Sequence, residues 1–370
     1  MGWDIVALRV TAFLLGVVMV WATLASVIKT FVLPRAAPDF LARAVFLGVR
    51  SVFNVRLRRA RSYTDRDAIL SFFAPVSLLM LLPIWYTAVL FAYALAYWAL
   101  GSPWDEAFRL SGSSLFTLGF FSAGDLPHAV LIFSEAALGL LLVALLIAYL
   151  PTMYAAFSRR EAAVNLLEVR AGNPPSAPEM LKRYHRIHGL DQLHDVWHAW
   201  EVWFADVEES HTSLPAIVFF RSPRPEHSWV TASGAVLDTA ALTLAAVDVP
   251  HDPQADLCLR AGYIALRRIS DYFEIPYDPA PRPDDPISIT RAEFDAVCDD
   301  LAAQGLPIKP DREQAWRDFA GWRVNYDVVL LRLAGLTLAP VAPWSSDRAL
   351  SHRVPLVPIL RRQRSSRERP

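Results

Sequence analysis

Three long runs without a charged side chain constrain this sequence more than any other feature. They cover residues 10–28, 68–104 and 136–158. A helix of about 20 apolar residues crosses the roughly 30 Å of hydrocarbon in a bilayer, and each run reaches this length. One such run could be a buried core helix, but three make that reading improbable. The first run lacks the basic start and cleavage site of a signal peptide, so we interpret it as a span.

Arginine placement predicts the orientation of the spans. Residues 34–67 contain eight arginines, whereas residues 101–128 contain only Arg109. By the positive-inside rule the first segment is cytoplasmic and the second faces outward. We therefore expect a multi-pass protein of the plasma membrane, with its N-terminus outside and its C-terminal half in the cytoplasm. The only two cysteines, Cys258 and Cys298, are then expected to be reduced thiols.

Two basic segments predict contact with anionic lipid of the inner leaflet. If residues 39–62 are helical, four arginines share one stripe beside apolar surface, as in a helix that lies at the membrane interface. These four are Arg43, Arg50, Arg58 and Arg61. The tail, residues 361–370, holds five arginines and is expected to be disordered. The net charge of −1 argues against a nucleic-acid partner.

The segment between the second and third spans predicts a re-entrant loop. Residues 102–106, Ser-Pro-Trp-Asp-Glu, form a strong helix start, with a serine cap, an early proline and acids at the positive helix end. The helix that follows, 103–116, is too short to span and leads into Thr117, Leu118, Gly119 and Phe120. Irregular backbone at membrane depth persists only where protein shields it or where it lines a watery path. A pore is therefore the leading interpretation.

This loop also suggests a mechanism. The negative end of helix 103–116 would favour a cation, and the carbonyl groups of residues 117–120 could replace its hydration shell. The Thr117 hydroxyl could add a further ring of oxygens. One loop cannot encircle an ion, so such a pore requires several subunits.

The four residues 117–120, Thr-Leu-Gly-Phe, resemble the start of the T-V-G-Y-G-D filter of the two-span, bacterial-type potassium channels. The stretch from Glu135 to Gly139 and the apolar run after it are similar to the inner helix of that family. The resemblance implies a homotetramer with K⁺ as the permeant ion and no other cofactor. It also implies an outer helix over 68–99, an inner helix over 128–158 and a gating role for Gly139. The resemblance covers about a quarter of the chain, to which an N-terminal span has been added.

The filter of this sequence departs from the pattern of the family at one position. Phe121 stands where the second filter glycine is expected, and the Gly-Asp pair arrives later, as Gly124 and Asp125. That glycine gives the chain a conformation that is costly for a residue with a Cβ atom. The substitution bears directly on ion selectivity.

Several residues of this region have two interpretations. Thr117 and Gly119 could form a plain turn in a membrane scaffold, and Glu135 could mark an ion path, a buried partner or the headgroup level. Gly139 could be a hinge or a close-packing contact between helices. Pro151 is expected to weaken the inner helix near its cytoplasmic end.

The cytoplasmic half predicts a helical domain with one candidate metal site. We expect helices over 159–171, 177–187, 191–209, 231–246, 255–273, 290–304 and 311–336, separated by proline-rich connectors. On the helix 191–209 and just after it, histidines and glutamates recur at helical spacing, as in metal-binding bundles. These are His194, His198, Glu201, Glu208 and His211. Because only one such motif occurs, a solvated or salt-bridged face is the commoner reading.

The sequence thus predicts an all-α membrane protein with three transmembrane helices, a re-entrant pore helix and filter loop, and a helical cytoplasmic domain. Its regions are an N-terminal span with an interfacial helix (1–66), a potassium-channel-like pore domain (67–158), the cytoplasmic domain (159–360) and the basic tail (361–370). A cation channel is the first hypothesis. A non-conducting scaffold or sensor is the second, and an enzyme with the candidate metal site is the third. No phosphate-binding loop or catalytic triad supports an enzyme.

Overall fold

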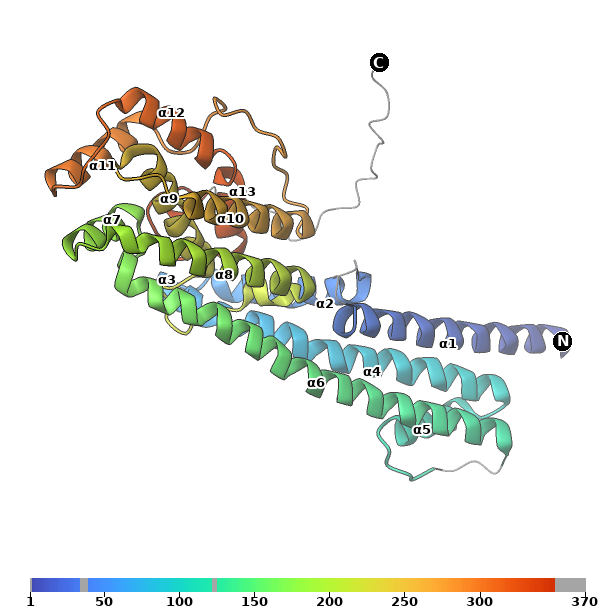
Figure 1. Cartoon of the computed structure of the whole chain (residues 1–370). Helices are drawn as coiled ribbons and strands as arrows, with labels where there is room; N and C mark the ends of the chain where they lie inside the picture. The colour runs from blue at the N-terminus through green and yellow to red at the C-terminus, as the bar shows by residue number, and fades with distance from the viewer. Residues whose placement is uncertain (1, 34–38, 122–124, 350–370) are drawn as a thin grey trace, which may run out of the picture. The chain divides into compact units, whose positions relative to one another are not determined.

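The computed structural model describes residues 2–33, 39–121 and 125–349, and within these ranges the chain is helical with no β-strand (Figure 1). The chain divides into two compact units. Unit 1 comprises Met1–Ala60 and Ile69–Ala156, and unit 2 comprises Arg61–Ala68 and Phe157–Pro370. The all-helical class predicted from the sequence is confirmed. The predicted basic tail, 361–370, lies outside the described residues.

Within the described residues, four stretches of helix are long and apolar enough to cross a membrane. Three lie along the predicted spans: α1 (Gly2–Phe31), the stretch 63–100 that ends with α4 (Phe73–Leu100), and α6 (Leu126–Ala171). The fourth is α9 (Trp229–Ala246), which lies almost wholly buried inside unit 2. The first three expose most of their apolar side chains, which fits a multi-pass membrane protein.

Helix α4 forms the centre of unit 1 and packs closely against α1. At the crossing of these two helices, a Cβ atom on Gly16 would lie 2.5 Å from the carbonyl oxygen of Ala92, so only glycine allows this approach. Toward the C-terminal end of α1, the indole N–H of Trp85 donates to the Ser26 hydroxyl over 3.0 Å, and the Phe31 ring meets the Trp85 ring edge-on. Small residues and a buried polar pair therefore fix α1 on α4.

Helix α2 (Phe40–Leu57) is shorter than the predicted 39–62. Asp39 caps its N-terminus by accepting from the Ala42 N–H, and the same carboxylate accepts from the Ser26 hydroxyl of α1. Phe46 and Phe53 pack edge-on against Phe73 at the start of α4. Apolar side chains thus hold α2 against the start of α4.

Helix α6 is one continuous helix of 46 residues, which corrects two predictions. The sequence predicted an inner helix over 128–158 and a separate helix over 159–171. Pro151 lies inside α6 without ending it. The helix ends only before Gly172, whose φ of +82° is a left-handed conformation that favours glycine. The charges after Ser158 end the apolar run, but they do not break the helix.

Unit 2 is a bundle of helices that follows the predicted series closely. It contains α3 (Tyr63–Leu70), most of which belongs to this unit, the end of α6, and then helices α7 to α13 with three short 3₁₀ turns. Their bounds are α7 (Ala177–Arg186), η1 (Leu190–Gln192), α8 (Leu193–Ser213), η2 (Pro215–Phe219), α9, α10 (Pro253–Tyr272), α11 (Arg291–Ala303), α12 (Arg312–Arg323), α13 (Asp327–Thr337) and η3 (Ser346–Arg348).

The predicted helix 311–336 is two helices, because the chain breaks at residues 324–326. The Asn325 side chain donates to the carbonyl oxygens of Gly321 and Trp322 and so competes with the helical pattern. The guanidinium of Arg267 donates to the Asn325 carbonyl over 2.8 Å. These three bonds stabilise a turn where propensity alone favours continuation.

A buried ion network joins the central helix α9 to α12 and α13. The fully buried Arg323 side chain donates to Asp238 of α9, to Asp327 over 2.8 Å and to the Trp344 carbonyl over 2.5 Å. Tyr326 donates its hydroxyl to Asp238 over 2.8 Å. Because a buried charge without a partner is costly, each member of this network depends on the others.

We expect Asp238→Ala to lower the free energy of unfolding of unit 2 by about 3–5 kcal/mol, because it removes one partner of a buried arginine. Near-UV circular dichroism of the detergent-solubilised full chain during thermal unfolding measures this loss. The control is Glu313→Ala, whose carboxylate pairs with arginines at the surface and should change the transition far less. Equal shifts in the two variants would contradict the role given to the network.

Candidate functional site

A short helix, α5 (Trp104–Leu115), lies between the second and third apolar helices of unit 1. Its 12 residues extend over about 18 Å, which is too little to cross a bilayer. Gly101 ends α4 with a φ of +119°, and Pro103 precedes the first turn of α5, where Asp105 and Glu106 lie at the positive helix end. The start of this helix agrees with the sequence pattern to within one residue.

Two buried serines fix α5 between α4 and α6. The Ser111 hydroxyl lies 2.9 Å from the Leu90 carbonyl oxygen of α4 and 2.5 Å from a carboxyl oxygen of Glu135 on α6. The Ser114 hydroxyl donates to the Ile132 carbonyl of α6 over 2.7 Å. These bonds satisfy polar groups inside an apolar region and fix the position of α5 relative to α4 and α6.

Glu135 is completely buried at the junction of these three helices. One carboxyl oxygen lies 3.0 Å from the Tyr97 hydroxyl of α4 and the other 2.5 Å from the Ser111 hydroxyl of α5. Of the interpretations that the sequence left open, this geometry matches a buried partner. Glu135 therefore links the short helix to both of its neighbours.

Ser113 organises the loop that follows α5. Four consecutive backbone N–H groups point at this one residue. Those of Leu118 and Gly119 donate to its carbonyl oxygen over 2.8 and 3.5 Å. Those of Phe120 and Phe121 donate to its hydroxyl oxygen over 2.9 and 3.2 Å. The loop is thus folded against the C-terminal end of α5.

This arrangement fixes the direction of the carbonyl groups of residues 117–120. In a planar trans peptide, a carbonyl and the N–H of the next residue point in opposite directions. Because the four N–H groups face Ser113, the four preceding carbonyls face away from it. Within the described residues, no hydrogen bond reaches these four carbonyl oxygens.

The loop backbone contains two left-handed residues, which the turn requires. Thr117 has a φ of +54° and Gly119 a φ of +72°. A Cβ atom on Gly119 would meet nothing within 4 Å, so its backbone conformation, and not space, favours glycine there. The Thr117 hydroxyl donates to the Phe116 carbonyl over 2.7 Å.

Gly139 lies where α6 passes the end of α5. A Cβ atom at this position would lie 2.3 Å from the Leu115 carbonyl oxygen, which excludes any larger residue without a shift of the backbone. The Gly139 carbonyl accepts from the Tyr86 hydroxyl over 2.7 Å. The structure therefore gives Gly139 a close-packing role, and α6 is helical on both sides of it.

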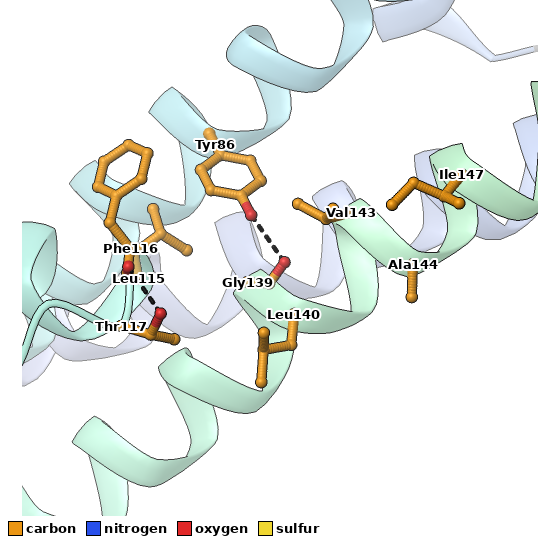
Figure 2. A pocket seen from close by; sticks show the side chains of 9 residues that line it. All are labelled: Tyr86, Leu115, Phe116, Thr117, Gly139, Leu140, Val143, Ala144 and Ile147. Atoms are coloured by element: carbon orange, nitrogen blue, oxygen red, sulfur yellow. Dashed lines mark hydrogen bonds between the residues drawn. The ribbon is translucent and has the colours of Figure 1, made fainter.

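An apolar pocket of about 450 Å³ adjoins the loop (Figure 2). Figure 2 shows the Tyr86 hydroxyl pointing to the Gly139 carbonyl, with Thr117 at one end and Ile147 at the other. The wall consists of Tyr86, Leu115, Phe116, Thr117, Gly139, Leu140, Val143, Ala144 and Ile147. Its two hydroxyl groups both bond to backbone carbonyls, so the pocket offers no charged group to a ligand.

The far side of the loop is largely exposed. Phe120 and Phe121 show 76% and 39% of their surface to solvent in the single chain. Residues 122–124 lie outside the described ranges, and with them Gly124 of the late Gly-Asp pair. Asp125 accepts from the His128 ring over 2.9 Å at the start of α6. Exposed aromatic side chains therefore adjoin the carbonyl groups of residues 117–120.

The five candidate metal ligands do not come together. His194 pairs with Asp252, Glu208 with Arg268, and the His198 ring lies 3.9 Å from Glu201, all at the surface of unit 2. His211 is buried, and both of its ring nitrogens have neighbours within 3.3 Å, Arg160 and Ser210. Burial and the Arg160 charge hold the pKa of His211 well below its ordinary value. Among the described residues, no group of three or more His, Cys, Asp or Glu could hold a metal ion.

The known proteins offer no relative from which a role for this site could be inferred. No family model matches the chain, and neither a curated protein nor a solved structure does so.

The sequence pattern predicted a short helix with a turn after it, but it missed the serines that position this turn. Ser111, Ser113 and Ser114 resemble the polar residues of any mixed helix. The signal that could have found them is their number: three of five consecutive residues are serines in a helix between two apolar spans, where each hydroxyl needs a partner.

We expect Ser113→Ala to speed hydrogen exchange of the Phe120 and Phe121 amides about fivefold, because a lost hydrogen bond costs about 1 kcal/mol. The Leu118 amide donates to the Ser113 backbone and serves as an internal control that should not change. Ser113→Thr keeps the hydroxyl and should preserve the slow exchange. If the amides of residues 118–121 exchange as slowly in Ser113→Ala as in the wild type, the hydroxyl does not hold the loop.

Proposed function

We propose that this chain is a subunit of a homotetrameric, passive cation channel of the plasma membrane, with potassium as the permeant ion. The observation that carries the proposal is the convergence of four N–H groups on Ser113, which turns the carbonyls of residues 117–120 away from this residue. A row of bare carbonyls at membrane depth is costly unless water or an ion satisfies it. Carbonyl rings of this kind replace the hydration shell of K⁺.

Symmetry follows from the same geometry. One loop offers carbonyls on one side only, so an ion needs equivalent loops from other subunits around a shared axis. In this arrangement α5 is the pore helix, residues 117–121 form the filter, and α4 and α6 are the outer and inner helices. The C-terminal end of α5 carries partial negative charge and would attract cations to the axis.

Arginines at the end of α2 support the proposed orientation. Arg56, Arg58 and Arg59 are exposed, and within the described residues no carboxylate pairs with them. Exposed arginines beside Val52 and Val55 suit anionic headgroups of the inner leaflet. In the proposed orientation, the connection between α1 and α4 lies on the cytoplasmic side and the N-terminus lies outside.

The alternative is a non-conducting scaffold or sensor that acts through unit 2. Such a protein needs no row of carbonyls pointing away from its own chain, and a reconstituted flux assay separates the two functions. Net cation flux supports the channel, and its absence from a correctly assembled protein supports the scaffold.

We expect Gly119→Asp to abolish cation flux without preventing assembly. Aspartate tolerates a left-handed conformation, and the position has open space, so the loop should still form. A ring of carboxylates would bind cations too tightly for them to leave. Potassium flux from liposomes measures the loss. Gly48→Asp, at an equally open position in α2, is the control; unchanged flux in Gly119→Asp would rule out the filter assignment.

We expect Phe121→Gly to sharpen the preference for potassium over sodium, because glycine allows a backbone conformation that a Cβ atom makes costly. The reversal potential in mixed potassium and sodium should shift toward the potassium equilibrium potential. Phe133→Ala removes an aromatic side chain exposed on α6 and should leave it unchanged. A constant reversal potential in Phe121→Gly would place Phe121 outside the ion path.

A further inference from the structure

A short segment of unit 2, residues 217–221, contacts both stretches of this unit that continue directly into unit 1. We call this segment the strap. It begins in η2 and ends at Arg221. One of the two stretches is α3, which leads into α4, and the other is the end of α6. All the contacts described below lie within unit 2.

The fully buried Arg160 of α6 binds the first part of the strap. Its guanidinium donates to the Ile217 carbonyl over 2.9 Å and to the Phe220 carbonyl over 2.7 Å. Glu161 accepts from the same group over 2.8 Å and balances its charge. The Phe220 ring lies 5.9 Å from the ring of Phe157, one turn earlier on α6. This part of the strap is therefore attached to α6 by two backbone carbonyls and an aromatic contact.

Arg221, the next residue, binds α3. Its guanidinium donates to the Asp67 carboxylate and the Tyr63 hydroxyl, both on α3, and lies 5.8 Å from the centre of the Tyr63 ring. The same group donates to the Thr337 carbonyl over 2.7 Å and to the Leu338 carbonyl over 3.1 Å at the end of α13. Asp67 is itself nearly buried, so this ion pair is shielded from water.

We infer that the strap couples α3 to the base of α6 mechanically, so that unit 2 moves the lead-in of the outer helix and the continuation of the inner helix together. The anchor points are consecutive residues, Phe220 and Arg221, and a single peptide link leaves them little freedom to separate. The inference rests on the proposed function for its consequence: the strap would set the balance between open and closed pores. Its structural part stands without conduction.

Hydrogen exchange of the full chain in nanodiscs tests the structural part. Asp67→Asn weakens the hold of Arg221 on α3 at nearly constant shape. We expect faster exchange in α3 and also, by about fivefold, in α6 around Arg160, on the far side of the strap. Two glycines inserted between Phe220 and Arg221 keep every contact group but lengthen the link. In the Asp67→Asn variant this insertion should abolish the faster exchange in α6. The same insertion between Ala280 and Pro281, in the connection between α10 and α11, should leave it intact.

Single-channel recording tests the functional part. The insertion between Phe220 and Arg221 should change the open probability about fivefold, with unitary conductance and reversal potential unchanged, because the ion path itself is untouched. Arg221→Lys, which keeps the charge, should change it less than Arg221→Ala. The control Arg268→Ala removes a surface ion pair elsewhere in unit 2 and should have no effect.

The outcomes separate the two proposals. If Asp67→Asn changes exchange in α3 alone, or if both insertions behave alike, the strap does not couple the helices, whether or not the protein conducts. If exchange is transmitted but the wild type passes no ions, the coupling stands and the channel proposal fails.

Discussion

The carbonyl and hydroxyl oxygens of Ser113 bind four successive amides of the loop after α5, and the rest of the site depends on this contact. Peptide geometry converts it into a row of carbonyl groups that point away from Ser113. If the loop carbonyls were instead hydrogen-bonded within the chain, they could not coordinate an ion. The contact therefore determines which polar groups of the loop are satisfied inside the chain and which need an external partner.

Around this contact, the buried polar side chains of unit 1 need hydrogen-bond partners inside an apolar bundle. Glu135 accepts from the Ser111 and Tyr97 hydroxyls and so joins three helices, and Ser114 donates to the backbone of α6. Gly139 lets the backbone of α6 approach the end of α5 where any side chain would collide. The short helix is thus held by hydrogen bonds and close backbone contact, since its 12 residues bury little apolar surface of their own.

Much of this architecture follows from local patterns in the sequence. Residues 102–106 predict the start of α5 because an early proline and helix-end charges act within one turn. The predicted serine cap is wrong, since Pro103 is the N-cap and the Ser102 hydroxyl lies 3.1 Å from the His128 ring. The continuation of α6 past Ser158 was missed because charge ends a membrane span without ending a helix, and α6 continues to Gly172. The partners of Ser113 and Glu135, and the bond from Arg221 to Asp67 across 154 positions, depend on tertiary packing, which spacing along one chain cannot reveal. Spacing along α8 also suggested a metal site, although His194 and Glu208 pair with Asp252 and Arg268 and only His198 and Glu201 lie beside each other.

Flux through the purified protein in liposomes, followed by recordings from single channels in mixed potassium and sodium, tests the central claim most directly. The account predicts discrete unitary currents from a tetrameric preparation and a reversal potential displaced toward that of potassium. A correctly folded tetramer that passes no cation, or a preparation that stays monomeric in lipid, would contradict it.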